Sequence, residues 1–302
     1  MTSLLDRAKN SLARRRTLSK EKKRDRAQPA SPPPAYSEAA PPPRASAAAA
    51  SVRSAASAYT RANMVRDDDP YYFLYHFDTV LLIDDSSSML GRRWREVQTA
   101  LQRLAPVCTS HDDDGVDLYF MNHLAASGTP PEGKAATGYY GLTDARQVEE
   151  LFGAVRPGGP TPTRRRLEDI LDPYMAQLEA ARASASAVKP LNLIVLTDGM
   201  PGPARAAGDN PHLPEPAVVG YARRLDALQA SAWQLGIQFI QVGDDPAATR
   251  ALDDLDRLPR RHRIRDIVDT TKPCSAAAPA ALTADFILKA VLGGVDRRLD
   301  AD

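Results

Sequence analysis

The sequence between residues 80 and 89 reads Val80-Leu81-Leu82-Ile83-Asp84-Asp85-Ser86-Ser87-Ser88-Met89. Four large apolar residues in a row are typical of a strand that is buried on both faces of a parallel sheet. The run ends abruptly in two carboxylates and three hydroxyls. Because open α/β sheets bind ligands at the carboxyl ends of their strands, this stretch predicts both the fold class and the place of a site.

Strand and helix signals alternate from residue 71 onward. Short apolar runs bounded by turn or charged residues predict strands at 77–83, 116–121, 191–197, 237–242 and 264–268. Apolar residues at three- or four-residue spacing predict helices near 94–104, 167–178, 218–228 and 286–295. Parallel strands need crossover connections, which are usually helical. We therefore expect an α/β fold with a Rossmann-like, doubly wound, mostly parallel central sheet flanked by helices.

Residues 1–70 differ in composition from the rest of the chain. They are first basic and then rich in Pro, Ala and Ser, with almost no aromatic or β-branched residues. Such a segment cannot bury enough apolar surface to offset the entropy lost on ordering. We expect a disordered N-terminal tail over residues 1–70 and a folded domain over residues 71–302.

Two short motifs lie in this tail. The segment Pro33-Pro34-Ala35-Tyr36 resembles the Pro-Pro-x-Tyr ligand of WW domains, in which Pro33 and Pro34 would dock on an aromatic groove and Tyr36 would fill a pocket. This resemblance implies an adaptor that recruits a WW-domain ubiquitin ligase, and a chance match in a proline-rich linker is the alternative. Arg14-Arg15-Arg16-Thr17-Leu18-Ser19 resembles a basophilic kinase site, with Thr17 or Ser19 as acceptor.

Charge and cysteine content limit the class of protein. The net charge of +1 argues against a whole-protein nucleic-acid footprint. The two cysteines, Cys108 and Cys274, are too far apart for a disulfide framework, and no apolar run is long enough for a spanning helix. We expect a cytoplasmic protein, with a nuclear location as the alternative, and no membrane association. The acidic run Asp112-Asp113-Asp114 lacks the alternating spacing of a calcium loop and is interpreted as solvated.

Two of the predicted strands end in a carboxylate, Asp84 and Asp198. If both strands are central, these side chains share one crevice and repel each other unless a cation or a proton compensates. Ser86 and Ser88 add neutral oxygen donors, and a set with few carboxylates suits Mg²⁺, or Mn²⁺, with coordination positions left open. The alternative is a capped strand-to-helix turn in which these groups only bind the first amides of the next helix.

Three motifs together resemble the metal-ion-dependent adhesion site of von Willebrand factor A domains. They are Asp84-x-Ser86-x-Ser88, the loop Gly158-Gly159-Pro160-Thr161-Pro162-Thr163, and Thr197-Asp198-Gly199. The resemblance runs from about residue 77 to about 299. Within this family, the chain most resembles intracellular fungal proteins, which share the short sequence segments at 236–243 and 265–270.

The resemblance implies a ligand set. Ser86 and Ser88 would bind the metal directly, Thr161 directly or through water, and Asp84 and Asp198 mainly through water. Thr163 is the alternative to Thr161. Many relatives have Gly where this chain has Ser87, and Asp85 is expected to be a hydrogen-bonding or solvated residue rather than a ligand.

In that family an acidic side chain of a protein partner completes the coordination of the metal. The resemblance therefore implies a non-catalytic, Mg²⁺-dependent protein-protein interaction module with no catalytic residues. The rival from another class is a phosphatase-like hydrolase that uses Asp84 as nucleophile. Such enzymes of the haloacid-dehalogenase type carry a second Asp two residues later, where this chain has Ser86.

Overall fold

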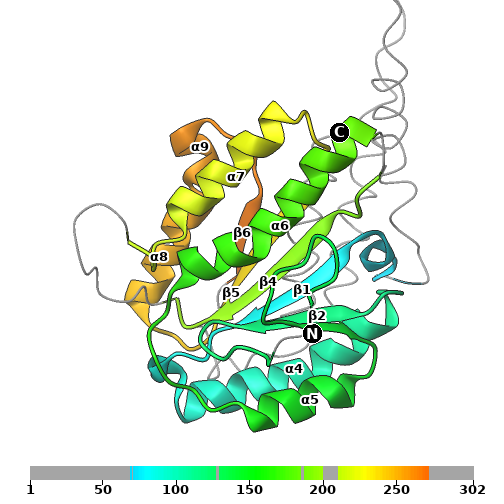
Figure 1. Ribbon diagram of the computed structural model, residues 1–302. Helices are drawn as coiled ribbons and strands as arrows, with labels where there is room; N and C mark the ends of the chain where they lie inside the picture. Colours follow the sequence, from blue (N-terminus) through cyan, green and yellow to red (C-terminus); the bar gives the residue numbers. More distant parts are fainter. Residues whose placement is uncertain (1–68, 70, 127–128, 185–186, 200–209, 272–302) are drawn as a thin grey trace, which may run out of the picture. The chain divides into compact units, whose positions relative to one another are not determined.

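The structure is a computed structural model that describes residue 69 and residues 71–126, 129–184, 187–199 and 210–271. The tail motifs at Thr17, Pro33, Pro34 and Tyr36 and the helix expected at 286–295 lie outside the described residues. The described residues form a six-stranded sheet with helices on both faces (Figure 1). The expected α/β, doubly wound architecture is confirmed.

The strand order places the predicted site at the centre of the sheet. The order is β3-β2-β1-β4-β5-β6, and every neighbouring pair is parallel except β2 and β3. The strands are β1 (Asp78–Ile83), β2 (Val116–Phe120), β3 (Tyr139–Leu142), β4 (Leu191–Thr197), β5 (Leu235–Gln241) and β6 (Val268–Thr271). The chain winds outward from β1 through β2 to β3 and then crosses to β4 on the other side of β1. The carboxyl ends of β1 and β4 therefore lie at the topological switch point.

The register between β1 and β4 brings the two predicted carboxylates to one edge. Ile83, the last residue of β1, pairs with Leu196, and the amide of Asp84 donates to the carbonyl of Leu196 at 2.9 Å. Every residue of β4 is buried. The near-continuous apolar character of both strands thus reflects their central place, with helices covering both faces.

Helices cover the two faces of the sheet in separate groups (Figure 1). Leu81 and Ile83 face one group, while Val80 and Leu82 face the other, as the period of two in a strand requires. One face carries α4 (Arg92–Ser110) and α5 (Ala145–Ala154); the other carries α6 (Thr163–Ser184), α7 (Glu215–Ala227), α8 (Pro246–Asp256) and α9 (Leu258–His262). Short 3₁₀ turns occur at η1 (Tyr72–His76) and η2 (Ser87–Met89).

Two expectations about strands are corrected. The strand expected at 264–268 begins only at Val268, directly after Ile267, whose carbonyl accepts a hydrogen bond from the Ile237 amide of β5 at 2.8 Å. Ile264 and Ile267 pack into the hydrophobic core, so the apolar run marks burial ahead of the strand. The antiparallel edge strand β3 was not predicted, since only Leu142 of its four residues is buried and Gly141 interrupts it with a φ of +60°. Helices α5, α8 and α9 were also missed.

Candidate functional site

Asp84 is the fully buried centre of the site. Its Oδ1 accepts a hydrogen bond from the Ser86 amide at 2.9 Å, and its Oδ2 accepts one from the Thr197 hydroxyl at 2.6 Å. Burial raises the pKa of Asp84 to about 6, although the bonds from Ser86 and Thr197 favour the charged form, and the charge of Asp198 adds to the rise. A cation beside this carboxylate would relieve the cost of keeping it charged.

The Ser86 and Ser88 hydroxyls meet next to Asp84. Their Oγ atoms are 3.0 Å apart; Ser86 is buried and Ser88 is exposed. The turn η2 brings them together, because it tightens the backbone directly after Ser86. Asp84, Ser86 and Ser88 thus form one row of oxygens from the strand end to the surface.

The loop that contains Thr161 is hydrogen-bonded to this row. The Ser87 amide donates to the Gly159 carbonyl, and the Gly159 amide donates to Ser87 Oγ, each at 3.0 Å. Gly159 has a φ of +91°, and a Cβ there would lie 2.8 Å from Asn122 Oδ1, so glycine is required. Ser87 does not have a positive φ, so the serine fits without strain, and its hydroxyl joins the two loops.

Two threonines follow in this loop. Thr161 is buried, and its carbonyl accepts hydrogen bonds from His212 Nδ1 at 2.7 Å and from the Thr163 amide at 2.9 Å. Thr163 begins α6, and its hydroxyl lies 3.8 Å from the sulfur of Met121 at the end of β2. Thr163 thus directs its hydroxyl at Met121, whereas the Thr161 carbonyl is held by His212 and the Thr163 amide.

Asp85 connects the ends of β1 and β2. It is buried; Oδ1 accepts from the Asn122 amide at 2.7 Å, and Oδ2 accepts from the His123 amide at 2.8 Å. Its carbonyl also accepts from the Gly158 amide at 2.7 Å. Both carboxylate oxygens are engaged by backbone, so Asp85 positions the loops around the site, in agreement with its interpretation as a hydrogen-bonding residue.

Asp198 follows β4 and is paired with an arginine that sequence reasoning missed. The Asp198 side chain has no exposed surface, and its Oδ2 lies 2.8 Å from Arg93 Nη1. The same Nη1 donates to the Ser88 carbonyl at 3.2 Å, so the guanidinium spans the gap between the Asp84-to-Ser88 loop and β4. A basic residue in the first turn of the helix after the Asp-x-Ser-x-Ser motif was the available signal.

The structure brings the predicted metal ligands to one edge of the sheet. Asp84, Ser86 and Ser88 are adjacent, and Arg93 links Ser88 to Asp198. The loop of Thr161 is held by Asp85 and Ser87. Thr197, like Arg93, was not predicted as a functional residue; it was part of the quoted motif, but its bond to Asp84 depends on the pairing of β1 with β4.

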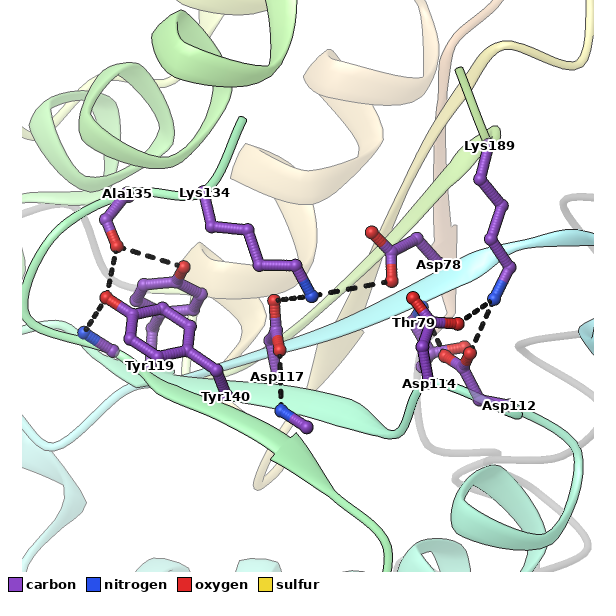
Figure 2. Close-up of polar contacts among 12 residues, drawn as sticks. Asp78, Thr79, Asp112, Asp114, Asp117, Tyr119, Lys134, Ala135, Tyr140 and Lys189 are labelled. Carbon is purple, nitrogen blue, oxygen red and sulfur yellow. Dashed lines mark hydrogen bonds and ion pairs between the residues drawn. The ribbon is translucent and has the colours of Figure 1, made fainter. Parts of the chain in front are cut away.

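A second polar cluster lies at the opposite edge of the sheet, where β1 and β2 begin (Figure 2). Lys134 Nζ lies 2.8 Å from Asp117 Oδ2 and 3.8 Å from Asp78 Oδ1. Lys189 Nζ lies 2.6 Å from Asp112 Oδ1 and 2.5 Å from Asp114 Oδ1. Oxygens of Asp78, Asp112 and Asp114 lie within 4.8 Å of one another, a spacing compatible with a metal ion.

Within this cluster, Asp112 corrects the interpretation of the acidic run as solvated. It is buried, and its Oδ2 accepts a hydrogen bond from the Thr79 amide at 2.8 Å. Burial raises the pKa of Asp112 to about 7, against the lowering effect of Lys189. The two lysines already compensate much of the acidic charge, so we interpret this cluster as an ion-pair network that attaches surrounding loops to β1.

Three of the four exposed large apolar side chains of the described residues lie in loops at the same edge of the sheet as the predicted site. Among the described residues the exposed large hydrophobic ones are Leu90, Leu124, Leu213 and Tyr75. The three leucines lie in the loops that follow β1, β2 and β4, at the same edge of the sheet as Asp84. Leu213 also lines a pocket of about 180 Å³ together with Thr197, Gly199 and His212. This edge therefore combines buried oxygen donors with an apolar rim.

No helix in the described part of the chain has the length and apolarity needed to cross a membrane. No protein-family model matches the sequence, and no curated protein matches it. Among solved structures, the chain is similar to the pilus adhesin SpaC from Lactobacillus rhamnosus GG in its open conformation, with 18% identity and a TM-score of 0.36. That match covers 71% of this chain but only 29% of the adhesin.

The chain is also similar to the manganese-loaded TRAP protein of Plasmodium vivax, with 14% identity and a TM-score of 0.38. This match covers 74% of each chain. Identities and TM-scores this low support no statement about what the present chain binds.

Proposed function

We propose that residues 71–302 form a von Willebrand factor A type domain that binds Mg²⁺, or Mn²⁺, and through the metal a protein partner. The metal ligands would be Asp84, Ser86, Ser88, Thr161 and Asp198. Their chemistry fits a hard divalent cation, because all five offer oxygen and only two are carboxylates. The guanidinium of Arg93 against Asp198 further supports a preference for positive charge at this place.

Thr161 is preferred to Thr163 as the threonine ligand. The Thr163 hydroxyl is directed at the Met121 sulfur, whereas Thr161 belongs to the segment that Ser87 and Asp85 hold against the other ligands. With few carboxylates bound to it, the cation would remain electrophilic toward an incoming acidic side chain.

The apolar rim is the observation that supports a protein partner. Leu90 is 61% exposed and Leu124 is 53% exposed, and both follow the strands that position the site. Single exposed leucines are common on protein surfaces, but the presence of three at one edge of the sheet supports an interaction surface there. We propose a partner that offers a carboxylate to the metal and apolar side chains to Leu90, Leu124 and Leu213.

The same geometry disfavours the rival hydrolase. A nucleophilic Asp84 would need an oxygen directed at the substrate. Here the side chain is fully buried, and both oxygens accept hydrogen bonds, from the Ser86 amide and the Thr197 hydroxyl. Asp84 is therefore better suited to hold a metal-bound water than to attack a phosphoryl group.

A metal titration of the full chain tests this proposal. A metal that binds only the native state raises its stability, by about 2.7 kcal/mol when its concentration is 100 times its Kd. We expect Mg²⁺ and Mn²⁺ to raise the melting temperature of the wild type and of Ser184→Ala, a control at an exposed serine of α6. Asp84→Asn and Ser86→Ala should lose the shift. No shift in the wild type at millimolar metal, or an equal shift in both site variants, would contradict the proposal.

We also propose, from the sequence motif alone, that the tail recruits a WW-domain ubiquitin ligase in the cytoplasm. Pro33 and Pro34 would supply the extended segment, and Tyr36 the anchoring side chain. A peptide of residues 29–40 should bind a WW domain, and Tyr36→Ala should abolish binding. A scrambled peptide of the same composition is the control, and equal binding of the three peptides would refute this role. Thr17 is proposed as a phosphorylation site.

A further inference from the structure

We infer that Arg93 is a built-in cation that competes with the divalent metal for Asp198 and so sets the metal affinity of the site. This inference rests on the proposed metal site and concerns its regulation. It assigns a role to a residue that is not itself a metal ligand.

The contacts of Arg93 with Asp198 and Ser88 support this inference. Its Nη1 lies 2.8 Å from Asp198 Oδ2 and 3.2 Å from the carbonyl of Ser88. One predicted ligand therefore receives a charge-assisted hydrogen bond, and the guanidinium lies against the backbone of another. A cation bound by Ser88 and facing Asp198 would compete with the guanidinium for the Asp198 carboxylate.

The two partners differ in their freedom to move. Asp198 directly follows the central strand β4, and its side chain is completely buried. The Arg93 side chain is 29% exposed and lies on the first turn of α4, and Gly243 leaves room for it, since a Cβ there would lie 3.1 Å from Arg93 Nε. A long, partly exposed arginine can turn out into water at low cost, whereas the carboxylate cannot follow it.

Electrostatics then make Arg93 and the metal alternatives. Without the metal, loss of Arg93 would remove a charge-assisted hydrogen bond from the buried Asp198 carboxylate, which is costly. With the metal, the charge of Arg93 adds repulsion between two cations at the same carboxylate. Arg93 should therefore stabilise the protein when metal is scarce and weaken the binding of metal when it is present.

The preceding residue, Arg92, is a matched control. Its side chain is 66% exposed, and its Nε donates to Glu96 on the same helix at 2.6 Å. It carries the same charge at the neighbouring position, but its ion pair with Glu96 stays within α4. An effect of Arg93→Gln that Arg92→Gln lacks must come from the contacts of Arg93 with Asp198 and the Ser88 carbonyl rather than from net charge.

Calorimetric titration of Mn²⁺ into the full chain tests the inference. We expect Arg93→Gln to bind Mn²⁺ about tenfold more tightly than the wild type, which corresponds to about 1.4 kcal/mol. Arg92→Gln should bind like the wild type, and Arg93→Lys, which keeps the charge, should stay closer to the wild type than Arg93→Gln does. In chelator, Arg93→Gln should melt at a lower temperature than the wild type, and saturating Mn²⁺ should remove that difference.

The outcomes separate this inference from the proposed function. If the wild type binds Mn²⁺ and Arg93→Gln binds it equally or more weakly, the competition between Arg93 and the metal is refuted while the metal site stands. If only Arg93→Gln binds Mn²⁺, the result supports both the metal site and the competition. If none of the four proteins binds millimolar Mn²⁺, both the metal site and the competition are refuted.

Discussion

The hydroxyl of Thr197 donates a 2.6 Å hydrogen bond to Oδ2 of Asp84 and joins the carboxyl ends of the two central strands. The same hydroxyl accepts a bond from the Gly199 amide at 3.0 Å, so it orients both the buried carboxylate and the backbone directly after Asp198. Because one oxygen of Asp84 is held by Thr197 and the other by the Ser86 amide, the carboxylate has little freedom to rotate. The proposed ligand Asp84 is thus oriented by Thr197, which is not itself a proposed ligand, and by the backbone of Ser86.

Removal of the Thr197 hydroxyl should destabilise the protein. Thr197→Val keeps the shape of the side chain but leaves a buried acceptor without its donor, which costs about 1 to 3 kcal/mol. Thr197→Ser keeps the hydroxyl and should lose clearly less stability. Urea denaturation of the three proteins in chelator measures the difference. Equal stability of the valine and serine variants would show that the bond to Asp84 contributes nothing.

Ser87 should stabilise the contact between the two loops of the site. Ser87→Ala removes the oxygen that accepts from the Gly159 amide, and we expect a loss of about 0.5 to 1.5 kcal/mol. Ser87→Gly should cost slightly more, because glycine also raises the entropy of the unfolded chain. Thermal denaturation with Ser184→Ala as reference measures both. A glycine variant more stable than the wild type would mean that the serine is strained.

The stacking of Trp94 on Phe152 should hold α5 against α4. The ring centroids are 4.0 Å apart with an angle of 17° between the planes, and Phe152 is fully buried. Phe152→Ala should therefore destabilise the protein by about 3 to 5 kcal/mol, and Phe152→Leu by less. Glu150→Ala, at an exposed position of the same helix, is the control, with an expected change within about 0.5 kcal/mol. A small effect of Phe152→Ala, in chemical denaturation, would place α5 outside the cooperative core.

The raised pKa of Asp112 predicts a pH dependence of stability. Its folded-state pKa of about 7 exceeds the ordinary value near 4, so folding favours the protonated form. Its contribution to stability is therefore greatest below pH 4 and is lost as the pH rises to about 7. Relative to the wild type, Asp112→Asn should gain at least ~1 kcal/mol between pH 4 and pH 7.5, since one pKa unit corresponds to about 1.4 kcal/mol.

Urea denaturation at several pH values measures this gain. Asp113→Asn, at the exposed neighbouring position, should show no such trend. A constant difference between the wild type and Asp112→Asn over this pH range would mean that Lys189 keeps Asp112 charged, as in an ordinary ion pair.

The central strands could be predicted and the edge strand could not. Strands β1 and β4 are buried on both faces, so their apolar runs are unbroken and the change to polar residues marks their ends. Strand β3 pairs only with β2, and Gly141 interrupts its four residues, so no continuous apolar run marks it in the sequence. The same holds for Arg93, since nothing at positions 92–93 indicates which arginine reaches Asp198, 105 residues away.

The sequence by itself determined the fold class and the edge of the sheet at which the candidate site lies. Hydrophobic periodicity and the polar residues at strand ends are local properties of the chain, and they can be recognised without a structure. Only the tertiary structure decided that Thr197 holds Asp84, that Ser87 holds the loop of Thr161, and that Arg93 pairs with Asp198. These contacts depend on strand order and register, which are set by the packing of the whole domain rather than by any short stretch of residues.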